Sequence, residues 1–261
     1  EMMIGREYQH VFPPKPAPPA HDKTPSLEVR NLNWAPQIKD ISLTAHAGEV
    51  VGLGGLDGQG QRELLLALFG VLRGTSGTVL IDGKPVNIKS PLMAKSSAIG
   101  MALIPEDRKT EGLMLPMSVL DNLSFAALSS FSRGGLINRK AEAESIDEMI
   151  RLLAIRTDGT SVPAGSLSGG NQQMLKPRII LLNDPTRGID VGTKQEIYQL
   201  LRKLADSGAT IILYSTDYDE LIGCCDKVLV LYDGAVKRVL TGPEITEKML
   251  VASALNIDVT E

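Results

Sequence analysis

The chain has 261 residues, with 27 Lys and Arg against 31 Asp and Glu, so its formal net charge is −4. Its 43% hydrophobic and 22% charged residues supply a packed core and exclude a chain that is disordered throughout. The acidic balance argues against a nucleic-acid partner, and no apolar run reaches the roughly 18 residues that a membrane helix needs. The adjacent Cys224 and Cys225 exclude a disulfide framework, and the three histidines show no metal-ligand spacing.

The first 26 residues differ in composition from the rest, because they hold six of the 15 prolines. Proline removes backbone donors and disfavours helix before it, so this stretch predicts an extended linker. We expect an upstream domain to precede it, and residues 27–261 to form the folded part.

From residue 27 onward, short apolar runs alternate with helical periodicity. Strands are predicted at 27–33, 38–44, 49–53, 79–81, 102–104, 179–182, 210–214 and 227–231. Helices are predicted from near Gly60, within 118–155, over 193–205 and after 214. This order predicts an α/β fold with an antiparallel β front, a mostly parallel core sheet and an inserted α-helical subdomain at about 115–176. Ligands of such sheets bind at the carboxyl ends of the strands.

A glycine-rich turn between a predicted strand and a predicted helix has the placement of a phosphate-binding loop. It consists of Gly55, Leu56, Asp57, Gly58, Gln59, Gly60, Gln61 and Arg62. The usual loop has Lys and then Ser or Thr after its last glycine, where this chain has Gln61 and Arg62. Taken alone, this glycine pattern is explained equally well by a strand-to-helix turn that binds no ligand.

A second glycine motif is more specific. It comprises Leu167, Ser168, Gly169, Gly170, Asn171 and Gln172 and is followed by Gln173. The serine can cap a helix, and the glycines leave backbone N–H groups open to an anion. The predicted strand 179–182 then ends in Asn183 and Asp184. A turn with Arg187, Gly188 and Asp190 follows.

These motifs together resemble the signature motif, Walker B strand and D-loop of the ABC-type ATPases, which have a P-loop NTPase fold. Residues 104–108, Ile-Pro-Glu-Asp-Arg, resemble the segment that replaces the Q-loop in sugar-importer ATPases, with Glu106 at the glutamine position. Over nearly its whole length, the chain is similar to the C-terminal nucleotide-binding half of a tandem sugar importer ATPase of the ribose, galactose and xylose type. Residues 1–26 resemble the tail of the preceding half and the linker between the halves.

The resemblance implies ATP and Mg²⁺ as cofactors and ATP-driven import of a monosaccharide. It implies three kinds of partner: the N-terminal ATPase half of the same polypeptide, two membrane permease subunits and, indirectly, a periplasmic sugar-binding protein. No nucleic acid is expected. The location implied is the cytoplasmic face of the bacterial inner membrane.

Residue by residue, the chain departs from the family at its own ATP site. Gln61 stands at the Walker A lysine, Asn183 at the Walker B aspartate, and Asp184 at the catalytic glutamate. Arg62 stands at the neighbouring hydroxyl position and Thr216 at the switch histidine. We expect Arg62 and Asn183 to weaken Mg²⁺ binding. This half would bind ATP at best and hydrolyse it weakly.

The signature motif is intact, and the resemblance implies that Ser168 and its glycines serve ATP held by the partner half. Trp34 stands where the family stacks an aromatic ring on adenine, although packing alone would also explain it. Arg187 and Asp190 are expected to contact the partner half or to form a local salt bridge. The carboxylates of residues 217–220 are expected to cap a helix, and Cys224 and Cys225 to be small buried residues.

The stretch after Gln173 is shorter than the family pattern by on the order of eight residues, about two turns of helix. Pro177 would stop a helix there. Either the helix is truly deleted or a stretch is missing from the numbering near Met174–Leu175. We favour the second, because losing this helix would leave the signature motif without support.

Two other functions stay open at this point. One is a regulatory module that binds ATP without hydrolysing it and locks a dimer. The other is a non-transport ABC ATPase that is soluble and acts on nucleic acid or the ribosome, against which the acidic charge and the segment around Glu106 both count.

Overall fold

The computed structural model describes residues 12–15, 24–125, 128–152, 159–164 and 177–257. The chain divides into two compact units. The first comprises Glu1–Glu106, Pro177–Arg187 and Ile197–Glu261, and the second comprises Asp107–Lys176 and Gly188–Glu196.

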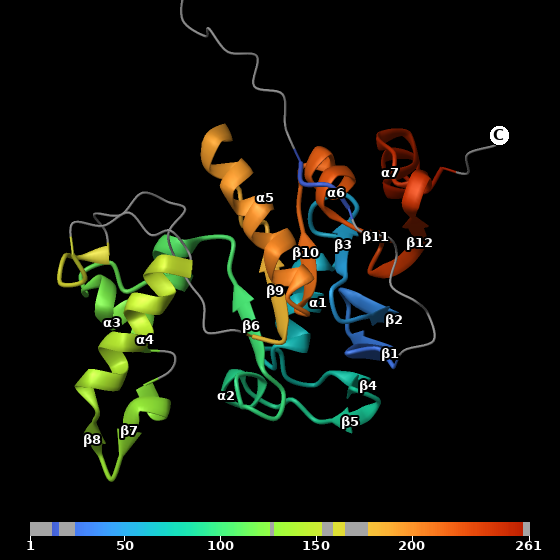
Figure 1. Cartoon of the computed structure of the whole chain (residues 1–261). Helices are drawn as coiled ribbons and strands as arrows, with labels where there is room; N and C mark the ends of the chain where they lie inside the picture. The colour runs from blue at the N-terminus through green and yellow to red at the C-terminus, as the bar shows by residue number, and fades with distance from the viewer. Residues whose placement is uncertain (1–11, 16–23, 126–127, 153–158, 165–176, 258–261) are drawn as a thin grey trace, which may run out of the picture. The chain divides into compact units, whose positions relative to one another are not determined.

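The first unit is built on a six-stranded sheet in the order β12-β11-β3-β10-β9-β6 (Figure 1). Its strands are β3 (Val50–Gly54), β6 (Met101–Ile104), β9 (Ile179–Asn183), β10 (Thr210–Tyr214), β11 (Lys227–Tyr232) and β12 (Ala235–Thr241). All neighbours are parallel except β11 and β12. Every residue of β3, β9 and β10 is buried, as expected of parallel strands covered on both faces.

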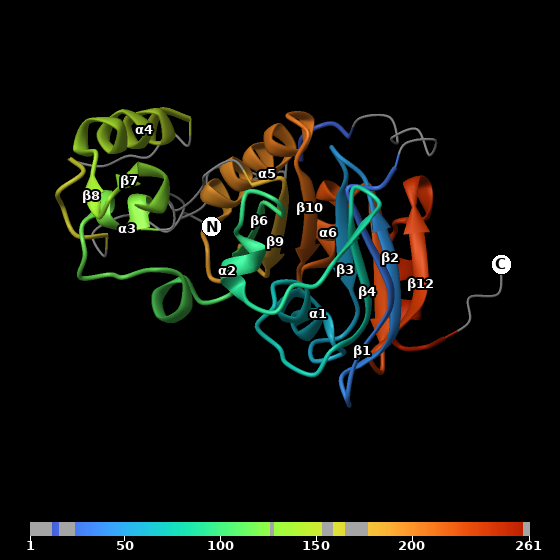
Figure 2. The same cartoon turned by 90° about the horizontal axis from the view of Figure 1, so that it is seen from below.

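A four-stranded antiparallel sheet in the order β2-β1-β4-β5 forms the front of this unit (Figure 2). It comprises β1 (Leu27–Trp34), β2 (Ile38–Ala45), β4 (Ser76–Ile81) and β5 (Lys84–Val86). From Ile41 to Ala45 the side chains of β2 alternate between buried and exposed, because one face packs on the core. The predicted fold, with its antiparallel front and mostly parallel core sheet, is confirmed.

Five helices complete the first unit: α1 (Gln61–Leu68), α2 (Pro91–Ala94), α6 (Tyr218–Cys224), α7 (Glu247–Ala254) and most of α5 (Val191–Asp206), among the residues that are described. A short 3₁₀ turn, η4 (Gly242–Glu244), leads into α7. The main apolar cluster joins both sheets and α1, with Leu53, Leu64 and Leu181 fully buried.

The second unit is helical but not one continuous helix. It contains η1 (Arg108–Gly112), α3 (Val119–Phe125), η2 (Leu128–Phe131), the hairpin β7 (Ser132–Arg133) and β8 (Leu136–Ile137), and α4 (Arg139–Leu152). The hairpin turns at Gly134 and Gly135, both with positive φ, which separates the two helices that share the helical period of 118–155. Val119, Leu123 and Ile146 form its small core.

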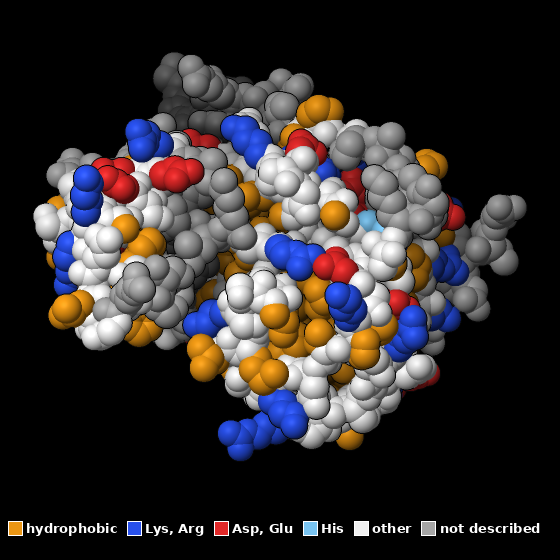
Figure 3. All heavy atoms as spheres, turned by 60° about the horizontal axis from the view of Figure 1, so that its bottom comes forward, with side chains coloured by type: hydrophobic (Ala, Val, Ile, Leu, Met, Phe, Trp, Pro, Cys, Tyr) orange, Lys and Arg blue, Asp and Glu red, His pale blue; other side chains and the backbone are white. Residues whose placement is uncertain are grey.

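Within the described part of the chain, no helix is both long and apolar enough to cross a bilayer. On the face shown in Figure 3, Lys and Arg side chains are spread among acidic and apolar ones.

Opposite the carboxyl ends of the strands, a buried ion network joins α5 to the start of the sheet. Arg202, 8% exposed at its side chain, contacts Asp226 at 3.2 Å and Asp206 at 2.8 Å. It also donates to the carbonyl of Gly48 at 2.7 Å, while Asp226 accepts from the amide of Val50 at 2.8 Å. Each buried charge is therefore paired, which buried charges require.

We predict that Arg202→Ala lowers the free energy of unfolding by about 3 kcal/mol, because it leaves the Asp226 carboxylate buried without its cation. Urea unfolding of the chain measures this. Lys203→Ala, at the exposed neighbouring position, is the matched control and should change stability by less than about 0.5 kcal/mol. Equal losses of unfolding free energy in the two variants would contradict a stabilising role for the buried ion pairs of Arg202.

Candidate functional site

The glycine-rich loop lies between β3 and α1, at the carboxyl end of a central strand. Gly55 and Gly60 have φ angles of 124° and 103°. A Cβ at Gly55 would lie 2.4 Å from the Leu231 carbonyl oxygen, and one at Gly60 would lie 2.5 Å from that of Gln37. Backbone approaches this close require glycine, so the loop has the tight form that the sequence predicts.

The side chain of Gln61 is used inside this loop. It is 1% exposed, and its Nε2 donates to the carbonyls of Leu56 at 3.0 Å and Gly54 at 3.2 Å. Its Oε1 accepts from the amide of Gln59 at 3.1 Å. The carboxamide therefore holds the loop closed on itself and brings no positive charge, and it occupies one of the N–H groups that an anion would use.

A carboxylate also belongs to the loop. Tyr214, at the end of β10, donates its hydroxyl to Asp57 Oδ1 at 2.9 Å. Burial and this hydrogen bond raise the pKa of Tyr214 well above its ordinary value, so the phenol stays a donor. Sequence reasoning included Asp57 only as a loop member and missed this pairing. The negative charge of Asp57 at this turn disfavours the binding of a polyphosphate, which is itself negatively charged.

Next along the edge of the sheet, β9 ends in two buried polar residues. Asn183 is 3% exposed, and its Oδ1 has no hydrogen-bond partner among the described residues. Asp184 is 2% exposed, has a φ of 45° and donates its amide to the Tyr214 carbonyl at 2.9 Å. An orphaned buried oxygen is costly, so the Asn183 acceptor is available for a donor that a ligand supplies.

The structure brings Asp184 and Thr216 together, although 32 residues separate them. Thr216 donates its hydroxyl to Asp184 Oδ2 at 2.7 Å. Burial raises the pKa of Asp184, and the hydrogen bond from Thr216 opposes that rise. The parallel pairing of β9 with β10 explains this meeting, because it places the two strand ends side by side.

Glu106 and Arg187 form an ion pair where β6 and β9 leave the sheet. Asp190 precedes α5 and accepts from the Thr193 amide at 3.0 Å and hydroxyl at 2.7 Å, which lowers the pKa of Asp190. Arg187 therefore has the local salt bridge that one of the two explanations requires, whereas Asp190 has local hydrogen bonds to Thr193 instead. Contact with a partner half stays a prediction.

Trp34 lies at the end of β1, partly buried against the main core, and donates Nε1–H to the Arg73 carbonyl at 3.0 Å. Stacking on adenine stays a prediction. Cys224 and Cys225 are both buried, as expected. Burial raises the pKa of the Cys224 thiol to about 12 and raises that of Cys225 as well, so neither is a reactive thiolate.

One buried cluster was missed by the sequence reasoning, and it is called the Glu220 cluster below. Glu220 is 1% exposed and accepts hydrogen bonds from the hydroxyls of Tyr198 at 2.8 Å, Thr186 at 2.5 Å and Ser215 at 2.8 Å. Only Asp217 caps α6, by accepting from the Asp219 amide. The sequence predicts that the carboxylates of residues 217–220 cap the helix. This prediction is wrong for Glu220, whose side chain is buried and bonded to the three hydroxyls.

The signature motif, Leu167 to Gln172, and the short stretch near Met174–Leu175 lie outside the described residues. No group of three or more acidic, His or Cys side chains within the described ranges is arranged to hold a metal ion.

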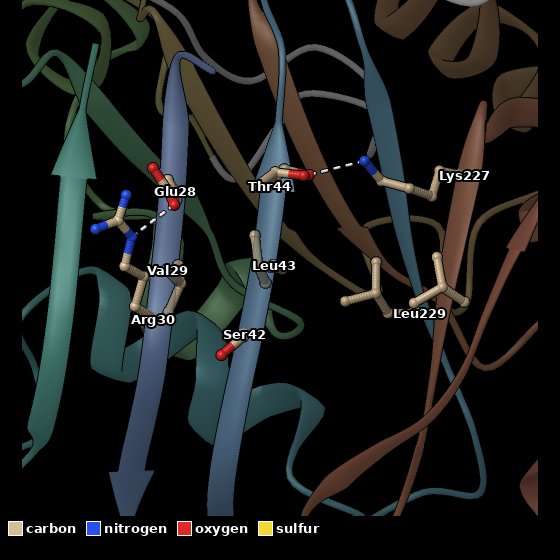
Figure 4. A pocket seen from close by; sticks show the side chains of 9 residues that line it. Glu28, Val29, Arg30, Ser42, Leu43, Thr44, Lys227 and Leu229 are labelled. Atoms are coloured by element: carbon tan, nitrogen blue, oxygen red, sulfur yellow. Dashed lines mark hydrogen bonds and ion pairs between the residues drawn. The ribbon is translucent and has the colours of Figure 1, made fainter. Parts of the chain in front are cut away.

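A separate groove of about 300 Å³ lies between the front sheet and β11 (Figure 4). Its charged groups are already paired: Arg30 contacts Glu28 at 2.6 Å, and Lys227 contacts Glu49 and the Thr44 carbonyl, each at 2.8 Å. The residues lining this groove include none of the loop or strand-end residues above, so the candidate site is the edge where β3, β9 and β10 end.

Comparison with known proteins agrees with this geometry. Residues 38–187 match a family model described as ABC transporter. The chain is 70% identical over 98% of its length to ribose import ATP-binding protein RbsA 1 of Mesorhizobium japonicum, and 63% identical over 98% to RbsA 1 of Rhizobium johnstonii. It covers 52% of each relative, so it spans about half their length. The alignments extend over 265 positions, so the relatives carry residues that this 261-residue chain lacks.

Two solved structures share the fold. A nucleotide-free ATP-binding cassette from an ABC transporter has a TM-score of 0.74 at 18% identity, covering 91% of this chain and all of that one. CbiO1 of Clostridium perfringens, part of the ABC transporter complex cbiONQ, has a TM-score of 0.72 at 24% identity, covering 88% and 94%.

Because the pKa of Asp184 is raised, the folded chain retains a proton that the unfolded chain releases, so stability falls as pH rises through that interval. We predict that Asp184→Asn melts higher than the parent at pH 8, by about 2–4 °C, with the difference closing toward pH 3. Scanning calorimetry across pH measures it. Asp190→Asn is the control of opposite sign, because the lowered pKa of Asp190 stabilises the fold at neutral pH. A pH-independent difference for Asp184→Asn would contradict the burial argument.

Proposed function

This chain belongs to the ABC transporter family, and on that premise we propose that it is the second nucleotide-binding half of an ATPase that powers monosaccharide import. The observation that carries the proposal is the 70% identity, over 98% of the chain, with a ribose import ATP-binding protein. Coverage of about half of that relative fits a tandem protein of which this chain is one half. The fold is that of ATP-binding cassettes, which supports ATP as the nucleotide.

The proposal extends to the domain organisation and partners. Residues 1–26 would be the tail of the preceding half and the linker, and residues 27–261 the nucleotide-binding domain, with its helical subdomain at about 115–176. The other half, two membrane permeases and a periplasmic sugar-binding protein would complete the machine. This chain would then lie against the cytoplasmic face of the inner membrane.

At its own site, the backbone of the glycine loop would receive the phosphates of ATP, and Trp34 would contact the adenine. Asn183 Oδ1 would accept a hydrogen bond from water on a bound Mg²⁺, which fits its orphaned state. A bound Mg²⁺ would neutralise charge on the phosphates. Asp184 would orient the attacking water, and Glu106 would lie beside it, paired with Arg187.

Three features of the loop and strand ends support weak hydrolysis at this site. Gln61 supplies no cation and is bonded within the loop, while the Asp57 carboxylate adds negative charge beside it. Asn183 is neutral where an anion would help to hold Mg²⁺. Asp184 is shorter than glutamate, and Thr216 already engages one of its oxygens. The charge on a transferring phosphoryl group needs preorganised cations, and Gln61 supplies none at the position of the usual lysine.

The signature motif would make the catalytic contribution of this half. Ser168, Gly169 and Gly170 would act on ATP bound by the other half, as hydroxyl and backbone donors to its phosphates. One alternative has support on the same observations: because Gln61 closes the loop, this half could bind ATP, or only adenine, as a regulatory module without turnover.

We predict that the double variant Gln61→Lys with Asp184→Glu binds ATP·Mg²⁺ about tenfold more tightly than the parent. The lysine supplies a cation to the phosphates, and the glutamate places its carboxylate one methylene group further from the backbone. Titration calorimetry on this chain measures the affinity. Asn87→Lys adds the same charge at an exposed position of the front and should leave the affinity unchanged. Unchanged affinity in the double variant would mean that the loop is closed to nucleotide for another reason.

We also predict that Ser168→Ala, made in the full-length tandem protein, lowers ATP turnover by about 10²-fold, because it removes a donor to the partner's triphosphate. Steady-state phosphate release measures it. The matched control is Ser166→Ala, two residues earlier, with an expected change below twofold. Equal turnover in the parent and the Ser168 variant would refute the contribution to the other half.

A further inference from the structure

We propose that residues Phe12–Lys15 form a docking segment that seats on α6 and is mechanically coupled, through Tyr198 and the Glu220 cluster, to the strand ends that carry Asp184 and Thr216. Figure 1 shows this short blue segment beside α6. The proposal concerns the chain's own segment and seat, so it stands whether or not this half binds nucleotide.

The seat exists because α6 has a glycine facing the segment. An added Cβ at Gly223 would lie 2.2–2.4 Å from three ring carbons of Phe12. No side chain could occupy this position while the ring stays where it is. Glycine within a helix costs stability relative to alanine, so its presence in α6 has a packing reason.

Two further contacts hold the segment in place. The Phe12 ring packs on the ring of Tyr198, with centroids 5.0 Å apart and planes tilted by 30°, a favourable aromatic geometry. Lys15 donates from Nζ to the carbonyl of Ile222 at 2.5 Å. This carbonyl belongs to the last turn of α6, where unsatisfied carbonyls attract a cation.

Tyr198 connects the seat to the interior. One face of its ring contacts Phe12, while its hydroxyl donates to Glu220 at 2.8 Å. The residue is 2% exposed, and burial raises its pKa beyond the ordinary range, so the hydroxyl remains a donor. The same ring therefore supports the segment and satisfies a buried carboxylate.

The Glu220 cluster then reaches both strand ends of the candidate site. Its donor Thr186 lies two residues after Asp184, and its donor Ser215 lies directly before Thr216. Thr216 in turn holds Asp184 at 2.7 Å. A buried carboxylate that loses one donor must recover it by shifting the others, because an unsatisfied buried charge is expensive.

Helix α6 transmits the same coupling along its axis. It starts two residues after Thr216 and bears the seat at Gly223, near its other end. A helix of seven residues depends on its tertiary contacts for stability. Unseating Phe12 should therefore loosen α6 together with residues 215–217.

Two measurements on the 261-residue chain test this. The chain has four phenylalanines, so labelling with 4-fluorophenylalanine gives few ¹⁹F signals, and Phe12→Ala identifies that of Phe12. Hydrogen exchange, followed by mass spectrometry, reports the amides of residues 215–224. We expect Phe12→Ala to speed exchange there about tenfold. Phe125→Ala, at an exposed phenylalanine of the second unit, is the matched control and should leave it unchanged.

In the Gly223→Ala variant, the direction of the change in hydrogen exchange shows whether Phe12 is seated on α6. Without the seat, alanine would stabilise the helix and slow its exchange roughly fivefold, because alanine is the better helix former. With the seat, the added methyl displaces the ring, so the ¹⁹F signal moves to the position of an exposed phenylalanine and exchange speeds up. Slower exchange or an unmoved signal would overturn the seat.

Tyr198→Phe separates docking from coupling. It keeps the ring that Phe12 contacts but removes the donor to Glu220, so we expect the ¹⁹F signal of Phe12 to stay shifted while residues 215–217 exchange about tenfold faster. If Phe12→Ala and Gly223→Ala unseat the segment but leave exchange at 215–217 unchanged, the coupling is refuted. Neither readout uses ATP, so a failure here is distinct from a failure of the proposed nucleotide function.

Discussion

The parallel pairing of β3, β10 and β9 is the constraint on which the site depends. Because these strands run in one direction and are buried on both faces, their carboxyl ends meet at one edge of the sheet. The glycine loop follows β3, Asn183 and Asp184 lie at the end of β9, and Thr216 lies two residues after the end of β10. Side chains more than a hundred residues apart therefore share one small region, and a change in the pairing would separate all of them.

At that edge, local hydrogen bonds take the place of strong charge. The Gln61 carboxamide satisfies the backbone of its own loop, Tyr214 engages Asp57, and Thr216 engages Asp184. Each is a neutral donor to a carbonyl or carboxylate, where phosphoryl transfer calls for fixed cations. These hydrogen bonds order the site, and under the proposed function they accompany weak hydrolysis there. Under that proposal, the signature motif rather than the local loop makes the catalytic contribution of this half.

The Glu220 cluster gives this edge a connection to the rest of the first unit. Its three hydroxyl donors come from the residue directly after β10, from the turn after β9 and from α5, so one buried carboxylate ties together three parts of the chain. Phe12 packs on the outer side of one of those donors. The N-terminal segment and the strand ends are therefore parts of one packed unit, joined by contacts that no local sequence pattern contains.

Sequence alone determined the parallel strands of the core sheet, because continuous apolar runs such as 179–182 and 210–214 have a strong local signature. It also determined the glycine loop, because the spacing of its glycines is local too. It missed β5, β12 and α7, whose half-exposed patterns are weak, and it read the helical period of 118–155 without the hairpin at Gly134 and Gly135. The tertiary structure alone decided what each polar group contacts: Gln61 turned inward, Glu220 buried rather than capping, Asp184 beside Thr216. Burial, strand pairing and the closing of the glycine loop set these contacts, and residue spacing carries no record of them.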